Sequence, residues 1–273
     1  MKTILLEDFH QDILSKAMRG LSIGKNEMAN RLNVHKSAID SVLQGALDEE
    51  LIRGMANELK IDGEKLVQSS KKEWMPPLVQ LEGLKQFNLP FGQMLVNTFL
   101  IWCMETRFAW VFDTGPDAEP IIEFIRKENL SVSSIFLTHT HLDHISCLKE
   151  LISNIENPEV LVHESEPLES ATFIREGFEA RIGKLSLRSL HTHGHSSGGM
   201  TYAIDGLNKP IAIVGDALFA GSMGGGMISY QDALRTNREK IMTLSDETIL
   251  CPGHGPMTTI AEEKKFNPFF PEF

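Results

Sequence analysis

The chain has 273 residues, enough for one large domain or for a medium domain with a small one beside it. Its hydrophobic content of 42% supports a buried core, and its net charge of −11 repels nucleic acid at long range. The three cysteines show no paired spacing, as is typical of reduced thiols in a cytoplasmic protein. Residues 1–6 lack the apolar core of a signal peptide, and no run approaches the ~18 apolar residues of a membrane span. We therefore expect a cytoplasmic protein without membrane contact.

Residues 1–72 are predicted to form a small all-α domain, because they contain no proline and their apolar residues recur at helical spacing. Within this stretch, residues 25–44 resemble the helix-turn-helix of phage-repressor-like domains. Ala29 takes the small-residue position of the first helix, Asn33 suits the left-handed turn, and Ile39 faces the first helix. Val34 is expected in the same small core. We expect a compact bundle of about four or five helices.

Two roles are open for this helical domain. Residues 1–73 carry 11 Lys and Arg against 12 Asp and Glu, a net charge of 11 − 12 = −1. DNA-binding modules are usually basic, because neutralised phosphates supply most of their affinity. Packing or homodimerisation, without strong nucleic-acid binding, is therefore favoured. The alternative is a DNA-bound sensor, in which these helices read an operator while the second domain senses or hydrolyses a ligand.

Residues 73–78 are predicted to be a linker that contains two adjacent prolines, and residues 79–273 form the second domain. A turn is expected at 113–115. Apolar runs predict its strands, at 94–103, 108–112, 133–137, 160–163, 185–190, 200–204, 210–214 and 248–251. Helical patterns are found at 117–129, 145–152 and 232–244 and from 259 onward. The aromatic tail near the end is expected to pack back onto this domain.

A dense group of metal-ligand residues follows the strand at 133–137. His139, His141, Asp143 and His144 fall within six residues. Imidazole and carboxylate are ligands for zinc or a similar divalent ion. We expect a tight loop in which these side chains converge, and a histidine-rich turn without a metal is the weaker interpretation.

Three later segments present the same residue types at the ends of predicted strands. His195 closes the cluster at 191–195, Asp216 ends an apolar strand, and His254 follows the strand at 248–251. Four strand ends that each offer a ligand predict a site at one edge of a sheet sandwich. The glycine-rich stretch 221–230 starts beside Asp216, so we expect it at the mouth of that site.

Taken together over roughly residues 78–273, these motifs resemble the metallo-β-lactamase superfamily and, within it, the glyoxalase II-like hydrolases. The resemblance implies an α/β fold, an αββα sandwich, preceded here by the all-α domain. It also divides seven ligands between two divalent ions. The first ion is held by His139, His141 and His195, the second by Asp143, His144 and His254, and Asp216 bridges both.

These ligands imply a binuclear hydrolase that attacks its substrate with a hydroxide bridging the two ions, oriented by Asp143 as the catalytic residue. Zinc is the expected metal, with iron or manganese as alternatives. The glyoxalase II resemblance implies a small-molecule thioester or related ester, as for hydroxyacylglutathione hydrolases. S-lactoylglutathione itself is disfavoured, because glyoxalase II has a basic helical domain after its metal domain, whereas 19 residues (255–273) follow His254 here.

Other members of the superfamily remain as alternatives. Lactonases and phosphodiesterases share all seven ligands, so the ligands do not separate them from thioesterases. Persulfide dioxygenase-like enzymes use a single iron and leave the second ligand set unused. The intact Pro-Gly-His-Gly motif at 252–255 favours two metals.

Overall fold

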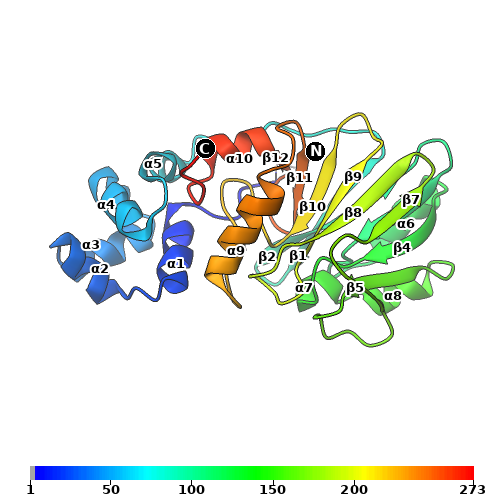
Figure 1. Ribbon diagram of the computed structural model, residues 1–273, viewed down its shortest axis with the longest axis horizontal. Coiled ribbons are helices and arrows are strands. Elements are labelled where there is room, and N and C mark those ends of the chain that lie inside the picture. Colours follow the sequence, from blue (N-terminus) through cyan, green and yellow to red (C-terminus); the bar gives the residue numbers. More distant parts are fainter. Residues whose placement is uncertain (1–3) are drawn as a thin grey trace.

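The computed structural model describes residues 4–273, so residues 1–3 of the predicted helical domain lie outside the described part. Five helices come first in the chain and gather at one end of the molecule, apart from two six-stranded sheets (Figure 1). These helices are α1 (His10–Gly20), α2 (Lys25–Leu32), α3 (Lys36–Leu43), α4 (Glu49–Leu59) and α5 (Gly63–Lys71).

The turn between α2 and α3 follows the sequence pattern closely. Asn33 has a φ of 53°, a left-handed conformation that asparagine tolerates better than most residues. Ala29 and Ile39 are both buried inside the bundle. Val34 was expected in the same core but is 36% exposed, because the chain reverses at Asn33 and carries the next side chain to the surface.

The rest of the chain contains two sheets that pack face to face. The first sheet has the order β1-β2-β3-β4-β5-β6, with bounds β1 (Leu84–Phe91), β2 (Met94–Trp102), β3 (Phe108–Phe112), β4 (Ser131–Phe136), β5 (Glu159–His163) and β6 (Thr172–Ile174). The second has the order β12-β11-β10-β9-β8-β7, with bounds β7 (Glu179–Ile182), β8 (Leu185–His191), β9 (Met200–Asp205), β10 (Ile211–Gly215), β11 (Ile249–Pro252) and β12 (Thr258–Thr259).

The alternation of side chains along β3 shows how the layers form. Trp110 and Phe112 point into the core between the sheets, whereas Ala109 and Val111 point to the outer face. That outer face is covered by α6 (Glu119–Lys127) and α8 (Leu148–Ser153). Helices α9 (Tyr230–Thr236) and α10 (Ile260–Phe266) lie against the second sheet. The predicted αββα sandwich with preceding helices is therefore confirmed.

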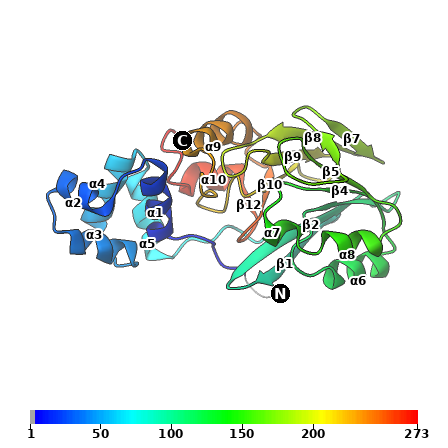
Figure 2. The same ribbon diagram turned by 90° about the horizontal axis from the view of Figure 1, so that it is seen from below.

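The helical domain shares its core with the second sheet layer. Its buried side chains form one continuous cluster with residues of β10, α9 and the aromatic tail, which includes the fully buried Phe269 and Phe270. Lys65 on α5 donates hydrogen bonds to the carbonyl oxygens of Lys264 and Phe270, both at 2.9 Å. Figure 2 shows α9 and α10 between the five helices and the sheets. The helices are thus packed on the sandwich.

Three predicted elements differ in the structure. The first metal segment is not a loop throughout, because Leu142–Ile145 forms the short helix α7, and the helix predicted at 145–152 is split between α7 and α8. The helix predicted at 232–244 is α-helical only as far as Thr236, where α9 ends. The chain then continues as a π-helical segment, η1 (Asn237–Ile241). The short helix α7 is held because the backbone N–H groups of Thr114 and Gly115 donate to the carbonyl oxygen of His144.

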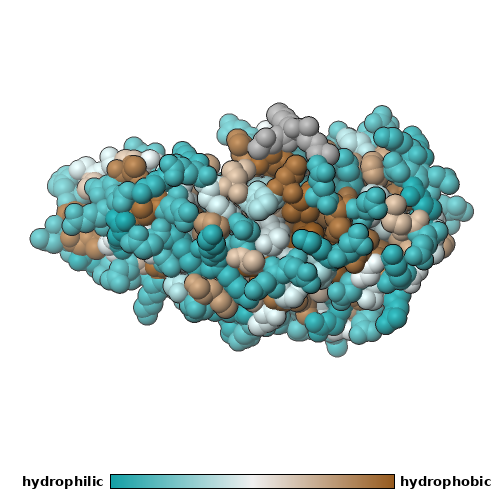
Figure 3. Space-filling model, turned by 90° about the horizontal axis from the view of Figure 1, so that it is seen from above, coloured by the Kyte–Doolittle hydropathy of each residue, from teal (hydrophilic) through white to brown (hydrophobic). Residues whose placement is uncertain are grey.

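The face shown in Figure 3 is largely hydrophilic, with its largest gathering of apolar side chains near the middle of the molecule. Within residues 4–273, no helix has the length and apolar character needed to cross a membrane.

Candidate metal centre

The structure brings all seven predicted ligand residues to one edge of the sandwich. Each comes from a segment that leaves a strand toward this edge. His139 and His141 follow β4, Asp143 and His144 lie on α7, His195 follows β8, Asp216 follows β10 and His254 follows β11. Strand ends that meet at one edge can place residues far apart in sequence around one point.

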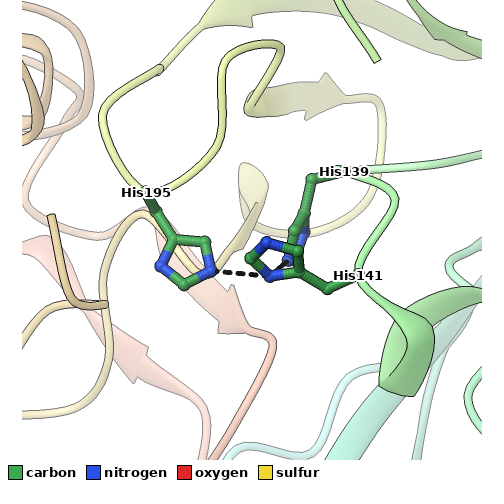
Figure 4. A group of neighbouring side chains, drawn as sticks. All are labelled: His139, His141 and His195. Atoms are coloured by element: carbon green, nitrogen blue, oxygen red, sulfur yellow. Dashed lines mark hydrogen bonds between the residues drawn. The ribbon is translucent and has the colours of Figure 1, made fainter. Parts of the chain in front are cut away.

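The first group consists of three histidines. The Nε2 atom of His139 lies 3.0 Å from Nδ1 of His141, and Nε2 of His195 lies 3.1 Å from the same Nδ1 atom. Figure 4 shows the three rings converging, with His139 and His141 from one segment and His195 from another. These nitrogens have the spacing of atoms that share one ion.

Hydrogen bonds on the far side of two of these rings define their tautomers. The Oγ1–H of Thr138 donates to Asp113, so this oxygen accepts from Nδ1–H of His139 at 3.0 Å. The Nδ1–H of His195 donates to the carbonyl oxygen of Gly225 at 2.9 Å. Both rings therefore direct an unprotonated Nε2 toward the group, as metal-binding histidines do.

The second group contains Asp143, His144 and His254. An Oδ2 atom of Asp143 lies 3.2 Å from Nε2 of His254 and 3.6 Å from Nε2 of His144. The far ring nitrogens are again engaged: Nδ1 of His254 donates to the carbonyl oxygen of Leu95 at 2.7 Å, and Nδ1 of His144 to Asp113 Oδ2 at 2.8 Å. The group thus presents two ring nitrogens and one carboxylate to a common point.

Asp216 lies between the two groups. Its Oδ1 atom is 3.3 Å from Nε2 of His144, and its Oδ2 atom is 3.3 Å from Nε2 of His195 and 3.5 Å from Nε2 of His254. The side chain is 8% exposed. One buried carboxylate therefore faces members of both groups, which is the placement that the family resemblance implies for a bridging ligand.

Two glycines allow the backbone to come this close to Asp216. A Cβ atom at Gly253 would lie 2.1 Å from Asp216 Oδ1, and one at Gly224 would lie 1.8 Å from the Asp216 carbonyl oxygen. Any side chain at either position would displace Asp216. Part of the glycine-rich stretch thus packs directly beneath the site.

The electrostatics of the protein atoms divide the site into two halves. Burial lowers the pKa of His139 well below its usual value and also lowers the pKa of His195. Burial would lower the pKa of His144 too, but the carboxylates of Asp216 and Asp113 raise it to about 10. The pKa of His254 is raised to about 11, chiefly by Asp216 and Asp143 against the effect of burial. The carboxylates around the second group therefore favour positive charge close to them.

The residues fit divalent ions. Three ring nitrogens face one another in the first group, and at least two of them carry lone pairs, so a cation between them removes a repulsive contact. Among residues 4–273, the buried Nε2 of His144 in the second group and the buried Oδ1 of Asp216 between the groups have no hydrogen-bond partner. These are the atoms that would bind the metals.

Two residues that were not predicted as part of the site hold its ligand segments in place through hydrogen bonds. Asp113 was expected only in a turn, yet it accepts hydrogen bonds from Thr138 N at 2.7 Å and from the His144 ring. The buried Glu166 was not predicted at all. It accepts from Thr140 N at 3.0 Å and from Gly198 N at 2.7 Å, which ties the two histidine segments together.

Three further histidines form a stack next to the segment that carries His195. His163 and His191 stack with ring centroids 4.1 Å apart, and the centroid of His193 lies 4.4 Å from that of His191. The Nε2 atom of His193 points to Asp232 at 3.8 Å. This stack belongs to neither of the convergent ligand groups.

Comparison with known proteins agrees with this arrangement. A family model described as the metallo-beta-lactamase superfamily matches residues 91–254, which contain all seven residues. The chain is similar to the probable metallo-hydrolase YqgX of Bacillus subtilis, at 29% identity over 70% of this chain and 99% of that protein. It is also similar to the hydroxyacylglutathione hydrolase GloC of Haemophilus influenzae, at 29% identity over 66% of this chain and 95% of that protein.

Solved structures show the same fold. The crystal structure of the BLEG-1 B3 metallo-beta-lactamase matches 69% of this chain and 99% of that chain, with a TM-score of 0.58 and 28% identity. That of ETHE1 from Myxococcus xanthus matches 67% of this chain and 83% of that chain, with a TM-score of 0.59 and 27% identity. With the family match spanning residues 91–254, the chain belongs to the metallo-beta-lactamase superfamily.

Proposed function

We propose that this protein is a binuclear, metal-dependent hydrolase that acts on a thioester or a related ester. The observation that carries the proposal is Asp216, a buried carboxylate that faces His195 of one ligand group and His144 and His254 of the other. Zinc is the proposed metal, with iron or manganese as alternatives. A carboxylate shared between two groups is the arrangement expected for two ions held side by side.

Two bound divalent ions would supply an activated water and a polarised substrate carbonyl. The protein's own contribution is to orient the reactants. Asp143 is suited to this task, because its carboxylate lies 3.2 Å from His254 and its side chain is 13% exposed at the rim of the centre. Burial would raise the pKa of Asp143, but the hydrogen bond with His254 lowers it overall, so the carboxylate is ionised at neutral pH and can accept a hydrogen bond that orients the attacking water.

The choice of a thioester is supported by similarity to the hydroxyacylglutathione hydrolase GloC. The metal ligands do not select this substrate class, because the same ligand groups suit lactones and phosphodiesters. A mononuclear iron dioxygenase needs one ligand group and does not use the second, which is fully assembled here.

The test combines metal analysis with a substrate panel. Protein purified without added metal is expected to contain two divalent ions per chain and to lose activity on chelation. A hydroxyacyl thioester is expected to give a higher kcat/KM than a lactone or a phosphodiester. One iron per chain, together with oxygen uptake on a persulfide, would replace hydrolysis with the dioxygenase function. Highest kcat/KM on the lactone or the phosphodiester would instead overturn the thioester assignment.

A further inference from the structure

A short segment before the first helix reaches the metal centre. We call residues 4–9 the N-terminal strap. If Gly255 carried a Cβ atom, the backbone nitrogen of Glu7 would lie 3.3 Å from it and the carbonyl oxygen of Leu5 3.6 Å from it. Gly255 follows His254 directly in the chain. The strap therefore runs against the residue next to a predicted ligand of the second ion.

The strap is fastened to the glycine-rich stretch that packs beneath Asp216. The carboxylate of Asp8 accepts a hydrogen bond from Ser222 Oγ at 2.7 Å and forms an ion pair with Lys16 of α1. Lys16 also donates to the carbonyl oxygen of Met223 at 2.9 Å. Asp8 is 7% exposed, so this is a buried anchor. The anchor holds Glu7 in one place relative to His254.

Lys16 forms an ion pair with Asp8, whereas among residues 4–273 no ion pair is found for Glu7. Lys16 lies over the Phe219 ring, 4.8 Å from its centroid, and that ring packs edge-on against His254 at 5.5 Å. Because the Lys16 ammonium pairs with Asp8, the two charges cancel near the centre. Glu7 is half-buried and adds a surplus negative charge on the same side.

The electrostatic surroundings of Glu7 agree with this position. Burial raises the pKa of its carboxyl group, and the His254 imidazole offsets part of that rise.

We propose that Glu7 is a specificity-determining residue that selects substrates by charge. A substrate group on the His254 side of the centre is favoured when it is neutral or cationic and disfavoured when it is anionic. This inference rests on the proposed function, and it narrows the substrate to thioesters or esters without negative charge on that arm. Glu7 lies outside residues 91–254, so this charge comes from a segment that the family match does not include.

The test uses three acetyl thioesters of similar size with the metal-loaded full chain. Their thiols are thiocholine, which is cationic, N-acetylcysteamine, which is neutral, and 3-mercaptopropionate, which is anionic. A unit charge acting across roughly 10 Å at an effective dielectric constant of about 20 changes a binding constant by about tenfold. In the Glu7→Gln variant, kcat/KM at low salt should fall by about tenfold for the cationic ester and rise by about tenfold for the anionic one. The neutral ester should change little.

The control is Glu50→Gln, which removes the same charge from an exposed position on α4. It should leave the ranking of the three esters unchanged. An unchanged ranking in Glu7→Gln, or an equal shift in the control, would overturn the inference.

A second readout separates this inference from the proposed function. Binding of the three free thiols to the metal-loaded protein is measured by isothermal titration calorimetry. If no thioester is hydrolysed, the proposed function fails, while the charge ranking of the thiols still decides the role of Glu7. The inference is supported if the unchanged protein binds thiocholine more tightly than 3-mercaptopropionate and if this difference in affinity is smaller in Glu7→Gln. It is rejected if the unchanged protein and Glu7→Gln show the same difference.

Discussion

At the scale of single residues, Asp113 supports a ligand of each group in the metal centre, His139 through Thr138 and His144 directly. It accepts hydrogen bonds from the backbone and hydroxyl of Thr138, at 2.7 and 2.8 Å, and from Nδ1 of His144. Its own φ is 56°, in the left-handed region that favours asparagine over most side chains. The charge of this residue can therefore be removed without straining the backbone.

We predict that Asp113→Asn keeps the fold but weakens zinc binding by about 10-fold to 100-fold, because His144 loses the carboxylate that orients its ring. Zinc affinity is measured by competition with a chromophoric chelator. Asp205→Asn, at an exposed strand end, is the matched control and should bind zinc like the unchanged protein. Equal affinity in the two variants would show that Asp113 is only a turn residue.

A second comparison at this scale concerns the cluster after β8. Asp216→Ala is expected to remove activity and most of the bound metal, since this one carboxylate faces both ligand groups. His193→Ala should retain both metals, because its ring points to Asp232. The measurement is metal content per chain. Similar metal loss in both variants would mean that His193 takes the role assigned to His195.

At the scale of elements, α10 holds the glycine-rich stretch in place through Glu263. This carboxyl group is fully buried and accepts hydrogen bonds from Gly221 N at 3.0 Å, Thr258 Oγ1 at 2.8 Å and Asn267 Nδ2 at 2.8 Å. Burial raises its pKa to about 8, although the three hydrogen bonds lower it in part. The helix therefore carries an acid that favours its neutral form.

This shift predicts a pH dependence of stability. A folded-state pKa above the unfolded value of 4.5 means that the folded chain holds the proton more tightly. The resulting stabilisation is complete below about 4.5 and is lost as pH rises through about 8. The urea concentration at the midpoint of unfolding should therefore decrease as the pH is raised from 6 to 9. This decrease should be much smaller in Glu263→Gln. Glu247→Gln, at an exposed position, should keep the full dependence, and a Glu263→Gln protein that keeps it too would contradict the assignment.

At the scale of the whole molecule, the helical domain is expected to pack or dimerise without strong DNA affinity. Its cations are largely paired within the domain: Lys25 lies 2.7 Å from Asp40, and Arg31 lies 2.6 Å from Glu27. Few of them are free to replace counterions on phosphates. Anisotropy with labelled random duplex DNA at low and moderate salt should show only weak binding. Sub-micromolar affinity that falls steeply with salt would favour the DNA-bound sensor.

Whether the sequence predicts a contact in the site depends on how many residues separate the two partners along the chain. The seven converging residues are predictable, because short motifs at strand ends carry them. Glu166 and Thr140 are 26 residues apart, and Asp8 and Ser222 are 214 apart, and no local pattern links either pair. The helix α7 was missed because tertiary contacts to His144, rather than local spacing, hold that turn.

The anchor between Asp8 and Ser222 also sets an order of events during synthesis. Asp8 is made 214 residues before its partner Ser222. At the usual speed of translation, that interval is on the order of 10–40 seconds. Throughout it, His254 is also unmade, so the nascent chain holds an incomplete second ligand group. A complete second ligand group therefore requires that the segment carrying His254 has been made.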